Sequence, residues 1–304
     1  GSLAIAGYDA SLAAIPPSAR PTAGRRPLCC MYRINRRVFL KSSTSAFAAG
    51  LVARLPGSAW AQAVGANDAI RVAVVGFNAR GAELIQQLLT TTGVRIAALC
   101  DVDPSVLARE VEALRARQIK VFATTDAREL LTRSDIDAVI LATGTRWHAL
   151  LTVWACQAGK DVYVEKPVSR TIWEGGQMIA AAARHGRIVQ SGVQLRSDTG
   201  IEEALRYVKE GHLGKVRWIR AVCHRLRDGI GRRRPWYPDT LNYDLFCGPT
   251  PMVPLERDRL HYDWHWMWGT GNGDQGNLGV HLLDIARRFV AHEVPPQRVI
   301  SIGG

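Results

Sequence analysis

The sequence predicts an α/β protein, with a doubly wound parallel sheet followed by a smaller α+β domain that carries an open sheet. Three observations favour this class. Apolar, β-branched runs alternate with segments of helical periodicity between residues 70 and 190, a glycine-containing turn follows the first run, and an aspartate follows the second. With 304 residues, of which 47% are hydrophobic, the chain can bury one full domain and most of a second.

The first apolar run, residues 70–75, is an expected strand that leads into a glycine-containing turn and an amphipathic helix. The turn reads Gly76-Phe77-Asn78-Ala79-Arg80-Gly81. Backbone amides of such a turn, at a helix N-terminus, can face a pyrophosphate, as in a dinucleotide-binding Rossmann domain. Asn78 replaces the middle glycine, and asparagine tolerates left-handed backbone angles better than most residues. We therefore expect Gly76, Asn78, Ala79, Arg80 and Gly81 to bind the cofactor.

The second expected strand, residues 94–99, is followed by Asp101, twenty residues after Gly81. A carboxylate at this position can accept hydrogen bonds from both ribose hydroxyls of adenosine, and its charge repels a 2′-phosphate. The cofactor is therefore expected to be NAD, with NADP disfavoured. The alternative is that Asp101 caps the helix that begins near Pro104.

The alternation continues to residue 190. Helices are expected at residues 106–114, around Leu130, at 147–157 and at 172–183, and strands near Val121, at 138–141, at 161–164 and at 188–190. Strands that alternate with helices form a parallel sheet, so residues 69–192 are expected to be one NAD-binding domain.

The N-terminal region contains an export motif. Residues 35–41 read NRRVFLK, and a short stretch rich in Ala and Gly leads to Ala59-Trp60-Ala61. This segment resembles a twin-arginine signal peptide over residues 31–61, which implies recognition by the twin-arginine export machinery, cleavage after Ala61 and a periplasmic or other extracytoplasmic location. Residues 1–30 are expected to be a disordered leader. An amphipathic N-terminal helix is the alternative.

Charge and cysteines exclude two classes of protein. Residues 1–61 hold eight Lys and Arg and one acidic residue, so this region accounts for +7 of the formal net charge of +12. The remaining +5 is too small an excess to indicate a phosphate-binding surface, and no motif typical of nucleic-acid binding accompanies it, so no nucleic-acid partner is expected. The cysteines form no C-x-x-C pair, so we expect no metal centre and no disulfide framework.

Two further motifs point to a known family. Glu165-Lys166-Pro167 follows the fifth expected strand, and G-x-H-x-x-D occurs at Gly279, His281 and Asp284. Together with the glycine turn, this ordered set resembles the glucose-fructose oxidoreductase, inositol dehydrogenase and rhizopine catabolism (Gfo/Idh/MocA) family over about residues 69–304. The resemblance implies an NAD-dependent oxidoreductase that acts on CH–OH groups.

The resemblance also implies roles for individual residues. Lys166 would lie beside the nicotinamide and stabilise the developing alkoxide of the substrate, and His281 would move the proton. The family usually has Asp four residues before this histidine, where Asn277 stands here, and Asn can orient a hydroxyl but cannot accept its proton. Further cofactor contacts fall on Thr143, Trp147, His148 and Glu165, and further substrate contacts on Gln194 and Arg196. Asp274, three residues before Asn277, either supplies a carboxylate to the substrate from the loop or caps the following helix. Gly144 replaces a proline that is common after the threonine.

Residues 193–304 are expected to be a partial substrate and oligomerisation domain. A helix is expected at 202–209 and strands at 215–224 and 298–302, with a long irregular stretch to residue 276. Trp264, Trp266 and Trp268 either stack on sugar rings or alternate as a strand in a core or oligomer interface. Because related proteins continue with more strands, the chain looks truncated, and we expect a homo-oligomer when the protein is full length.

The leading hypothesis is hydride transfer from a hydroxyl of a sugar, cyclitol or glycoside to tightly bound NAD. One alternative is glycoside cleavage by transient oxidation and elimination, with NAD regenerated in each turnover. The other alternative is a truncated nucleotide-binding remnant without catalysis.

Overall fold

The computed structural model describes residues 69–304, apart from 224–228, 230, 291–295, 297 and 301–304. The expected leader at 1–30 and signal peptide at 31–61 lie outside the described residues. Within the described part, no helix is long and apolar enough to cross a membrane.

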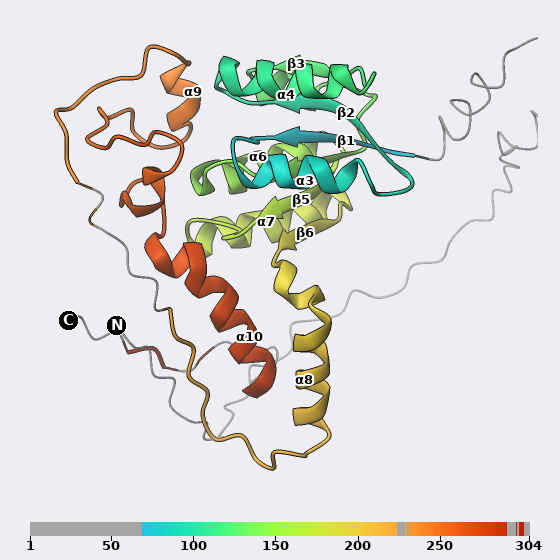
Figure 1. Ribbon diagram of the computed structural model, residues 1–304, viewed down its shortest axis with the longest axis vertical. Helices are drawn as coiled ribbons and strands as arrows, with labels where there is room; N and C mark the ends of the chain where they lie inside the picture. Colours follow the sequence, from blue (N-terminus) through green and yellow to red (C-terminus); the bar gives the residue numbers. More distant parts are fainter. Residues whose placement is uncertain (1–68, 224–228, 230, 291–295, 297, 301–304) are drawn as a thin grey trace, which may run out of the picture. The chain divides into compact units, whose positions relative to one another are not determined.

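A six-stranded parallel sheet forms the centre of the N-terminal domain (Figure 1). Its strands are β1 (Ile70–Val75), β2 (Val94–Cys100), β3 (Phe122–Thr124), β4 (Ala138–Leu141), β5 (Asp161–Glu165) and β6 (Val189–Gly192). Their order in the sheet is β3-β2-β1-β4-β5-β6. From β1 the strands are added outward on one side through β2 and β3, and from β4 they are added outward on the other side to β6. The strand order therefore reverses between the neighbouring strands β1 and β4, and a doubly wound sheet forms a ligand-binding crevice at this point.

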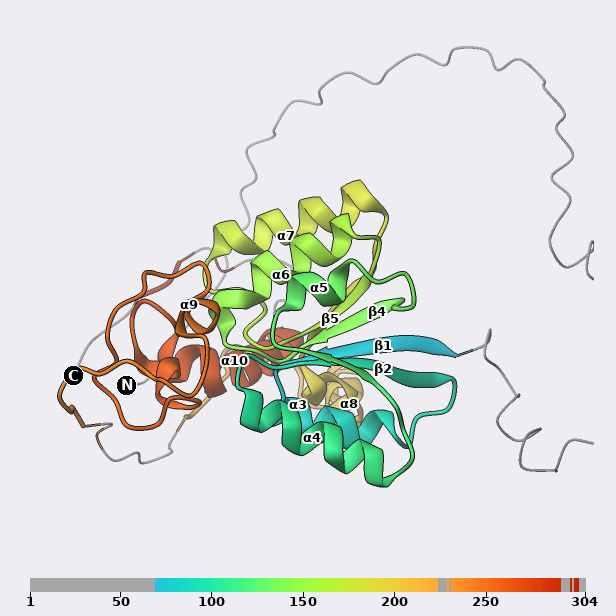
Figure 2. The same ribbon diagram turned by 90° about the horizontal axis from the view of Figure 1, so that it is seen from above.

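Helices cover both faces of the sheet (Figure 2). One face carries α3 (Arg80–Leu88) and α4 (Pro104–Ala116), and the other carries α5 (Ala127–Leu131), α6 (Thr145–Gln157) and α7 (Ile172–His185). Side chains of β1 alternate between two cores: Val72 and Val74 pack with Leu84 and Ile85 of α3, whereas Ala73 and Val75 belong to the cluster on the other face. This period-two burial is the pattern of a strand covered on both faces.

The remaining described residues are mainly helices and loops. They contain a 3₁₀ turn (Gln194–Ser197), α8 (Thr199–Lys209), α9 (Tyr243–Cys247), a second 3₁₀ turn (Asp263–Trp266), a π-helical turn (Gln275–Gly279) and α10 (Val280–Val290). A small core of Leu241, Tyr243, Phe246, Cys247 and Leu255 holds the loop region around α9 together.

The strand expectations for this region were wrong for its described residues. Residues 215–223 and 298–300 form no strand, and Trp264 and Trp266 lie on a 3₁₀ turn instead of alternating along a strand. Outside the six-stranded sheet, the described residues contain one isolated bridge, between Trp236 and Leu255. A strand needs a neighbouring strand for its backbone hydrogen bonds, and no described segment pairs with residues 215–223.

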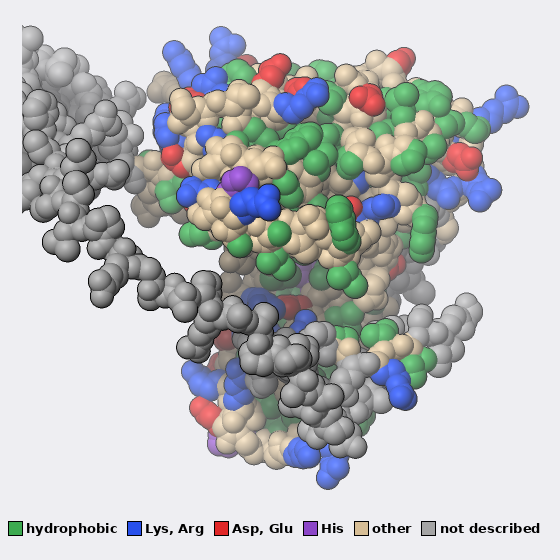
Figure 3. Space-filling model, turned by 180° about the vertical axis from the view of Figure 1, so that it is seen from behind, with side chains coloured by type: hydrophobic (Ala, Val, Ile, Leu, Met, Phe, Trp, Pro, Cys, Tyr) green, Lys and Arg blue, Asp and Glu red, His purple; other side chains and the backbone are tan. Residues whose placement is uncertain are grey.

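Figure 3 shows one face of the molecule, on which Lys and Arg side chains are spread out among apolar and acidic ones. The cations on this face do not gather into a single patch.

Candidate functional site

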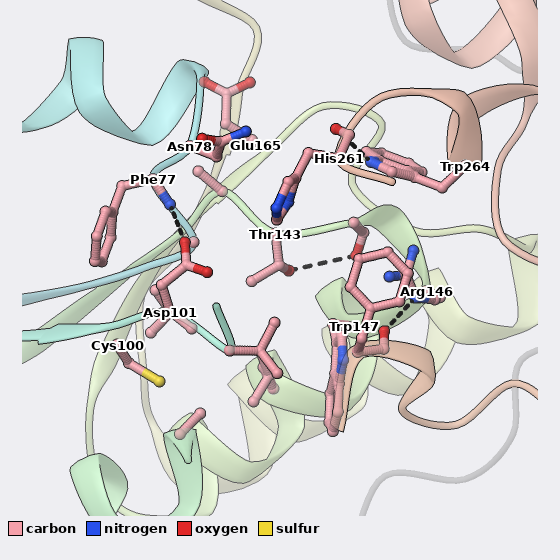
Figure 4. A pocket seen from close by; sticks show the side chains of 18 of the residues that line it. Phe77, Asn78, Cys100, Asp101, Thr143, Arg146, Trp147, Glu165, His261 and Trp264 are labelled. Atoms are coloured by element: carbon pink, nitrogen blue, oxygen red, sulfur yellow. Dashed lines mark hydrogen bonds between the residues drawn. The ribbon is translucent and has the colours of Figure 1, made fainter. Parts of the chain in front are cut away.

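A cavity of about 310 Å³ opens at the carboxyl ends of β1, β2, β4 and β5. Its walls come from both parts of the chain, because residues 245–246 and 261–265 of the C-terminal region line it together with the strand ends. In Figure 4, Phe77 and Asp101 lie to one side of Thr143, and Arg146, Trp147 and Trp264 lie to the other.

The glycine turn after β1 leaves no room for larger residues at its first and last positions. Gly76 has φ +79°, and a Cβ there would lie 2.9 Å from the Thr143 side chain. A Cβ at Gly81 would lie 2.0 Å from the carbonyl oxygen of Gly76. Asn78 needs no left-handed conformation, since Gln118 is the one non-glycine residue with positive φ in the described part of the chain. The turn therefore makes no use of the tolerance of asparagine for left-handed angles, and it depends on the outer glycines.

Asp101 is held by the backbone on both carboxylate oxygens. Phe77 N–H donates to Oδ2 and Asp103 N–H donates to Oδ1, each over 3.0 Å. The side chain lines the cavity, and its burial raises the pKa of the carboxyl. A carboxylate oxygen can accept more than one hydrogen bond, so both oxygens retain capacity for a ribose diol. Asp103, and not Asp101, caps α4, because Asp103 Oδ1 accepts from Ser105 N at 2.8 Å.

The Glu165-Lys166-Pro167 motif follows β5, and the Lys166–Pro167 peptide is cis. Glu165 is buried, with Arg80 Nε donating to Oε1 over 3.0 Å and Lys166 N donating to Oε2 over 3.1 Å. Both Arg80 and Glu165 line the cavity, but they pair with each other. Glu165 therefore fixes the backbone of Lys166 and the side chain of Arg80.

Lys166 and Asn277 meet at the cavity although they are far apart in sequence. Lys166 Nζ donates to the Asn277 carbonyl oxygen at 2.6 Å and to Asn277 Oδ1 at 3.3 Å. Burial lowers the pKa of Lys166, while the neighbouring Glu165 raises it. The π-helical turn before α10 is the element that brings Asn277 to this position.

His281 is not part of the cavity lining. Its side chain is buried, and Nδ1 has no hydrogen-bond partner among the described residues. Burial lowers the pKa of His281, and the charge of Lys166 lowers it further. The imidazole is therefore close enough to the ammonium to respond to its charge, and it is disposed to be neutral near pH 7.

Five other expected site residues also lie outside the lining: Gly81, His148, Gln194, Arg196 and Asp274. His148 is buried, with Nδ1 2.8 Å from the Pro167 carbonyl oxygen and Nε2 3.0 Å from the Thr143 carbonyl oxygen, so it links the ends of β4 and β5. Arg196 forms an ion pair with Asp284, the last residue of the G-x-H-x-x-D motif. Thr143 and Trp147, in contrast, line the cavity as expected.

Arg146 and His261 line the cavity although neither was predicted as a site residue, and the contact that Trp147 makes with the C-terminal region was not predicted either. Arg146 donates from Nε to the Phe246 carbonyl oxygen at 2.8 Å, and Trp147 Nε1 donates to the Leu245 carbonyl oxygen at 2.9 Å. His261 Nε2 lies 2.8 Å from Asp103 Oδ2, which attaches the loop after α9 to the end of β2. The sequence showed the group of tryptophans at Trp264, Trp266 and Trp268, but it did not show which residues of the Rossmann domain lie beside them.

Family models match both parts of the chain. Residues 70–193 match a model described as "Oxidoreductase family, NAD-binding Rossmann fold", and residues 231–300 match "Oxidoreductase family, C-terminal alpha/beta domain". The N-terminal domain is therefore an NAD-binding Rossmann domain of an oxidoreductase family. The two matches occur in order along one chain and are consistent with the Gfo/Idh/MocA family that the motifs resemble.

Curated relatives are similar over 222 residues. A "Glycosyl hydrolase family 109 protein" from Shewanella baltica (strain OS185) is 30% identical, over 65% of this chain and 48% of the relative. An "Alpha-N-acetylgalactosaminidase" from Shewanella oneidensis has the same identity and coverage. The chain thus spans about half the length of these relatives.

Solved structures share the fold. GenD2 from gentamicin A biosynthesis, solved in complex with NAD, has a TM-score of 0.52 at 20% identity, over 73% of this chain and 54% of GenD2. An NAD-binding protein from Listeria innocua has a TM-score of 0.50 at 19% identity, over 71% of this chain and 53% of the other.

Proposed function

We propose that the full-length protein is an NAD-dependent oxidoreductase that transfers a hydride from a hydroxyl of a sugar, cyclitol or glycoside to tightly bound nicotinamide. The observation that carries the proposal is the position of Lys166. Its ammonium lies in the wall of the cavity that also contains the glycine turn and Asp101, and its partners there are oxygen atoms of Asn277.

The cavity residues fit a dinucleotide. The turn at Gly76 and Gly81 has no space for a Cβ, so the backbone remains open to phosphates, and Asp101 can hold the adenosine ribose. When bound, NAD would supply the hydride acceptor. The protein's own groups must then orient the substrate and manage its proton.

Lys166, Asn277 and His281 suit those tasks. The Lys166 ammonium can donate a hydrogen bond to the substrate oxygen and stabilise negative charge that develops on it. Asn277 can orient the same hydroxyl. His281 lies outside the cavity lining, but its pKa is lowered and its Nδ1 has no hydrogen-bond partner among the described residues, so it could accept the proton through an intervening water.

A second candidate function is glycoside cleavage through transient oxidation and elimination. It is favoured by the names of the relatives, which are a glycosyl hydrolase family 109 protein and an alpha-N-acetylgalactosaminidase. A ketone formed by oxidation makes the neighbouring C–H bond acidic, so a base such as His281 could remove that proton while the glycosidic oxygen leaves. Addition of water to the resulting double bond and return of the hydride from the reduced cofactor to the ketone would then leave NAD unchanged after a full turnover.

Product analysis distinguishes the two candidates. The purified protein is denatured and its released nucleotide is identified by mass spectrometry. Native protein is then incubated with neutral sugars, cyclitols and aryl glycosides while NADH absorbance and products are followed. An oxidised, intact sugar with stoichiometric NADH supports the dehydrogenase, and a cleaved glycoside without net NADH supports elimination.

A matched pair of variants tests the role of the lysine. Lys166→Ala should abolish either activity but retain bound NAD, whereas Lys120→Ala changes an exposed lysine and should behave as the wild type. Bound NAD without turnover in the wild type, and with no effect of Lys166→Ala on any property, would instead indicate a non-catalytic remnant.

We further propose export of the protein by the twin-arginine route and self-association of the full-length form. Replacing Arg36 and Arg37 with Lys should leave a reporter fusion in the cytoplasm. Light scattering on the full-length protein would measure the oligomer, and a monomer at micromolar concentration would contradict the second expectation.

A further inference from the structure

Arg146, the second residue of α6, is a buried cation in the wall of the cavity. Its Nε donates to the Phe246 carbonyl oxygen, and its guanidinium lies 4.3 Å from the centre of the Phe246 ring. Nη1 is buried and has no hydrogen-bond partner among the described residues. No described acidic side chain forms an ion pair with Arg146, although carboxylates pair with many of the protein's other arginines.

The local electrostatics disfavour a cation at this position. Burial lowers the pKa of Arg146 to about 10, so the side chain is still charged near pH 7. It stands in the first turn of α6, where the helix dipole favours negative charge. Buried charges are normally compensated by a partner, and the described part of the protein supplies aromatic rings and one carbonyl oxygen to this guanidinium but no anion.

Gly144 makes the arrangement possible. A Cβ at Gly144 would lie 2.5 Å from Arg146 Nη1 and 3.1 Å from Cζ. Gly144 has φ −62° and ψ 141°, values open to any L-residue, so its backbone does not require glycine. The missing side chain provides the space that the guanidinium occupies beside the cavity.

We propose that Arg146 is the anion-binding residue of this cavity and that its guanidinium, seated against Gly144, binds an oxyanion of the ligand. The inference rests on the proposed function and specifies the ligand further. The oxyanion is either a phosphate of the dinucleotide or a carboxylate on the sugar substrate, since guanidinium recognises both through paired N–H donors. Arg146 lies across Thr143 from Asp101 (Figure 4), so the oxyanion binds away from the ribose that Asp101 holds.

Two variants test the proposal by different routes. Arg146→Gln removes the charge. Gly144→Ala keeps the arginine but places a methyl group 2.5 Å from the present position of Nη1, so the guanidinium must shift, and it does so without backbone strain at residue 144. The controls are Arg95→Gln, at an exposed arginine, and Gly176→Ala, at an exposed glycine with no neighbouring atom within 4 Å of the added Cβ. Circular dichroism and thermal unfolding establish that each variant is folded.

Affinities are measured by tryptophan fluorescence for NADH, ADP-ribose, inorganic pyrophosphate, D-glucuronate and D-glucose, after bound nucleotide has been removed. Loss of a hydrogen-bonded charge should weaken binding of the relevant anion roughly 10-fold to 100-fold. Weaker NADH, ADP-ribose and pyrophosphate binding identifies a phosphate. Loss of a preference for glucuronate over glucose, with NADH affinity retained, identifies a carboxylate.

Unchanged affinity for all four anions in folded Gly144→Ala and Arg146→Gln proteins would overturn the proposal. If Arg146→Gln does not fold, Gly144→Ala decides alone. Because the readout is binding, a protein without turnover can still confirm the anion site, and an active protein can still lack it. Failure of this inference and failure of the proposed function are therefore separate results.

Discussion

Replacing Asp101 with Asn should both weaken NAD binding and remove the barrier to NADP. The two side chains have nearly the same shape, so the change removes charge and leaves volume unaltered. In the structure, Asp101 is 6% exposed, and each of its oxygens accepts one backbone hydrogen bond over 3.0 Å. The carboxylate is thus fixed in place at the wall of the cavity and cannot turn away from a ligand.

The size of the effect follows from charge and distance. A 2′-phosphate placed about 4–6 Å from the carboxylate, at an effective dielectric constant of about 20, is repelled by about 3–4 kcal/mol per unit charge, or roughly 10²–10³-fold in affinity. Replacing charge-assisted ribose hydrogen bonds with neutral ones should cost NAD about 1–2 kcal/mol, or roughly 5-fold to 30-fold. Asp101→Asn should therefore reduce the ratio of the NADPH and NADH dissociation constants by at least roughly tenfold.

Fluorescence titration with NADH and NADPH measures this ratio in the wild type, in Asp101→Asn and in Asp135→Asn, which changes an aspartate paired with Arg133 away from the cavity. Since burial raises the pKa of Asp101, discrimination should begin to weaken at a higher pH than for an exposed aspartate. Equal affinity of the wild type for both nucleotides, or a ratio unaffected by Asp101→Asn, would refute the reasoning.

Three further changes have defined outcomes. Gly81→Ala places a Cβ 2.0 Å from a backbone oxygen, so we expect the free energy of unfolding, measured with urea, to fall by about 1–3 kcal/mol and NADH binding to be lost. Wild-type affinity for NADH in this variant would show that the turn adapts. Lys166→Met should raise the pKa of His281, because it removes a nearby positive charge, and an unchanged histidine titration by NMR would contradict the proximity. Hydrogen bonding from Arg71 lowers the pKa of Asp137 from 3.8 to about 2, so this pair stabilises the fold fully above about pH 4 and progressively less as the pH falls toward 2. Asp137→Asn should accordingly be less stable than the wild type at pH 7, and the difference should shrink as the pH falls and disappear below the folded pKa of about 2 in denaturant titrations. A difference independent of pH would argue against this account.

The sheet was predictable because its signals are local. Each expected strand of the N-terminal domain forms within a few residues of its predicted bounds, and 138–141 matches β4 at both ends. Burial on both faces requires continuous apolar runs, and the turn after β1 requires small residues where backbone atoms approach closely. The strand expected at residues 215–224 does not form in its described part, because a segment becomes a strand only when another strand pairs with it.

The sequence alone determined the doubly wound sheet, the glycine turn, the position of Asp101 and the location of Lys166 after β5. Hydrophobic periodicity and turn residues are properties of short segments, so each of these features can be predicted from its own stretch of sequence. Only the tertiary structure decided which distant side chains meet at the cavity. It brings Asn277 to Lys166 over 111 positions and Arg146 to the carbonyl oxygen of Phe246 over 100 positions, and it places His148 between two carbonyl oxygens instead of in the lining. Such contacts depend on how loops and helices pack after the sheet has formed, and a single sequence carries no periodic signal for them.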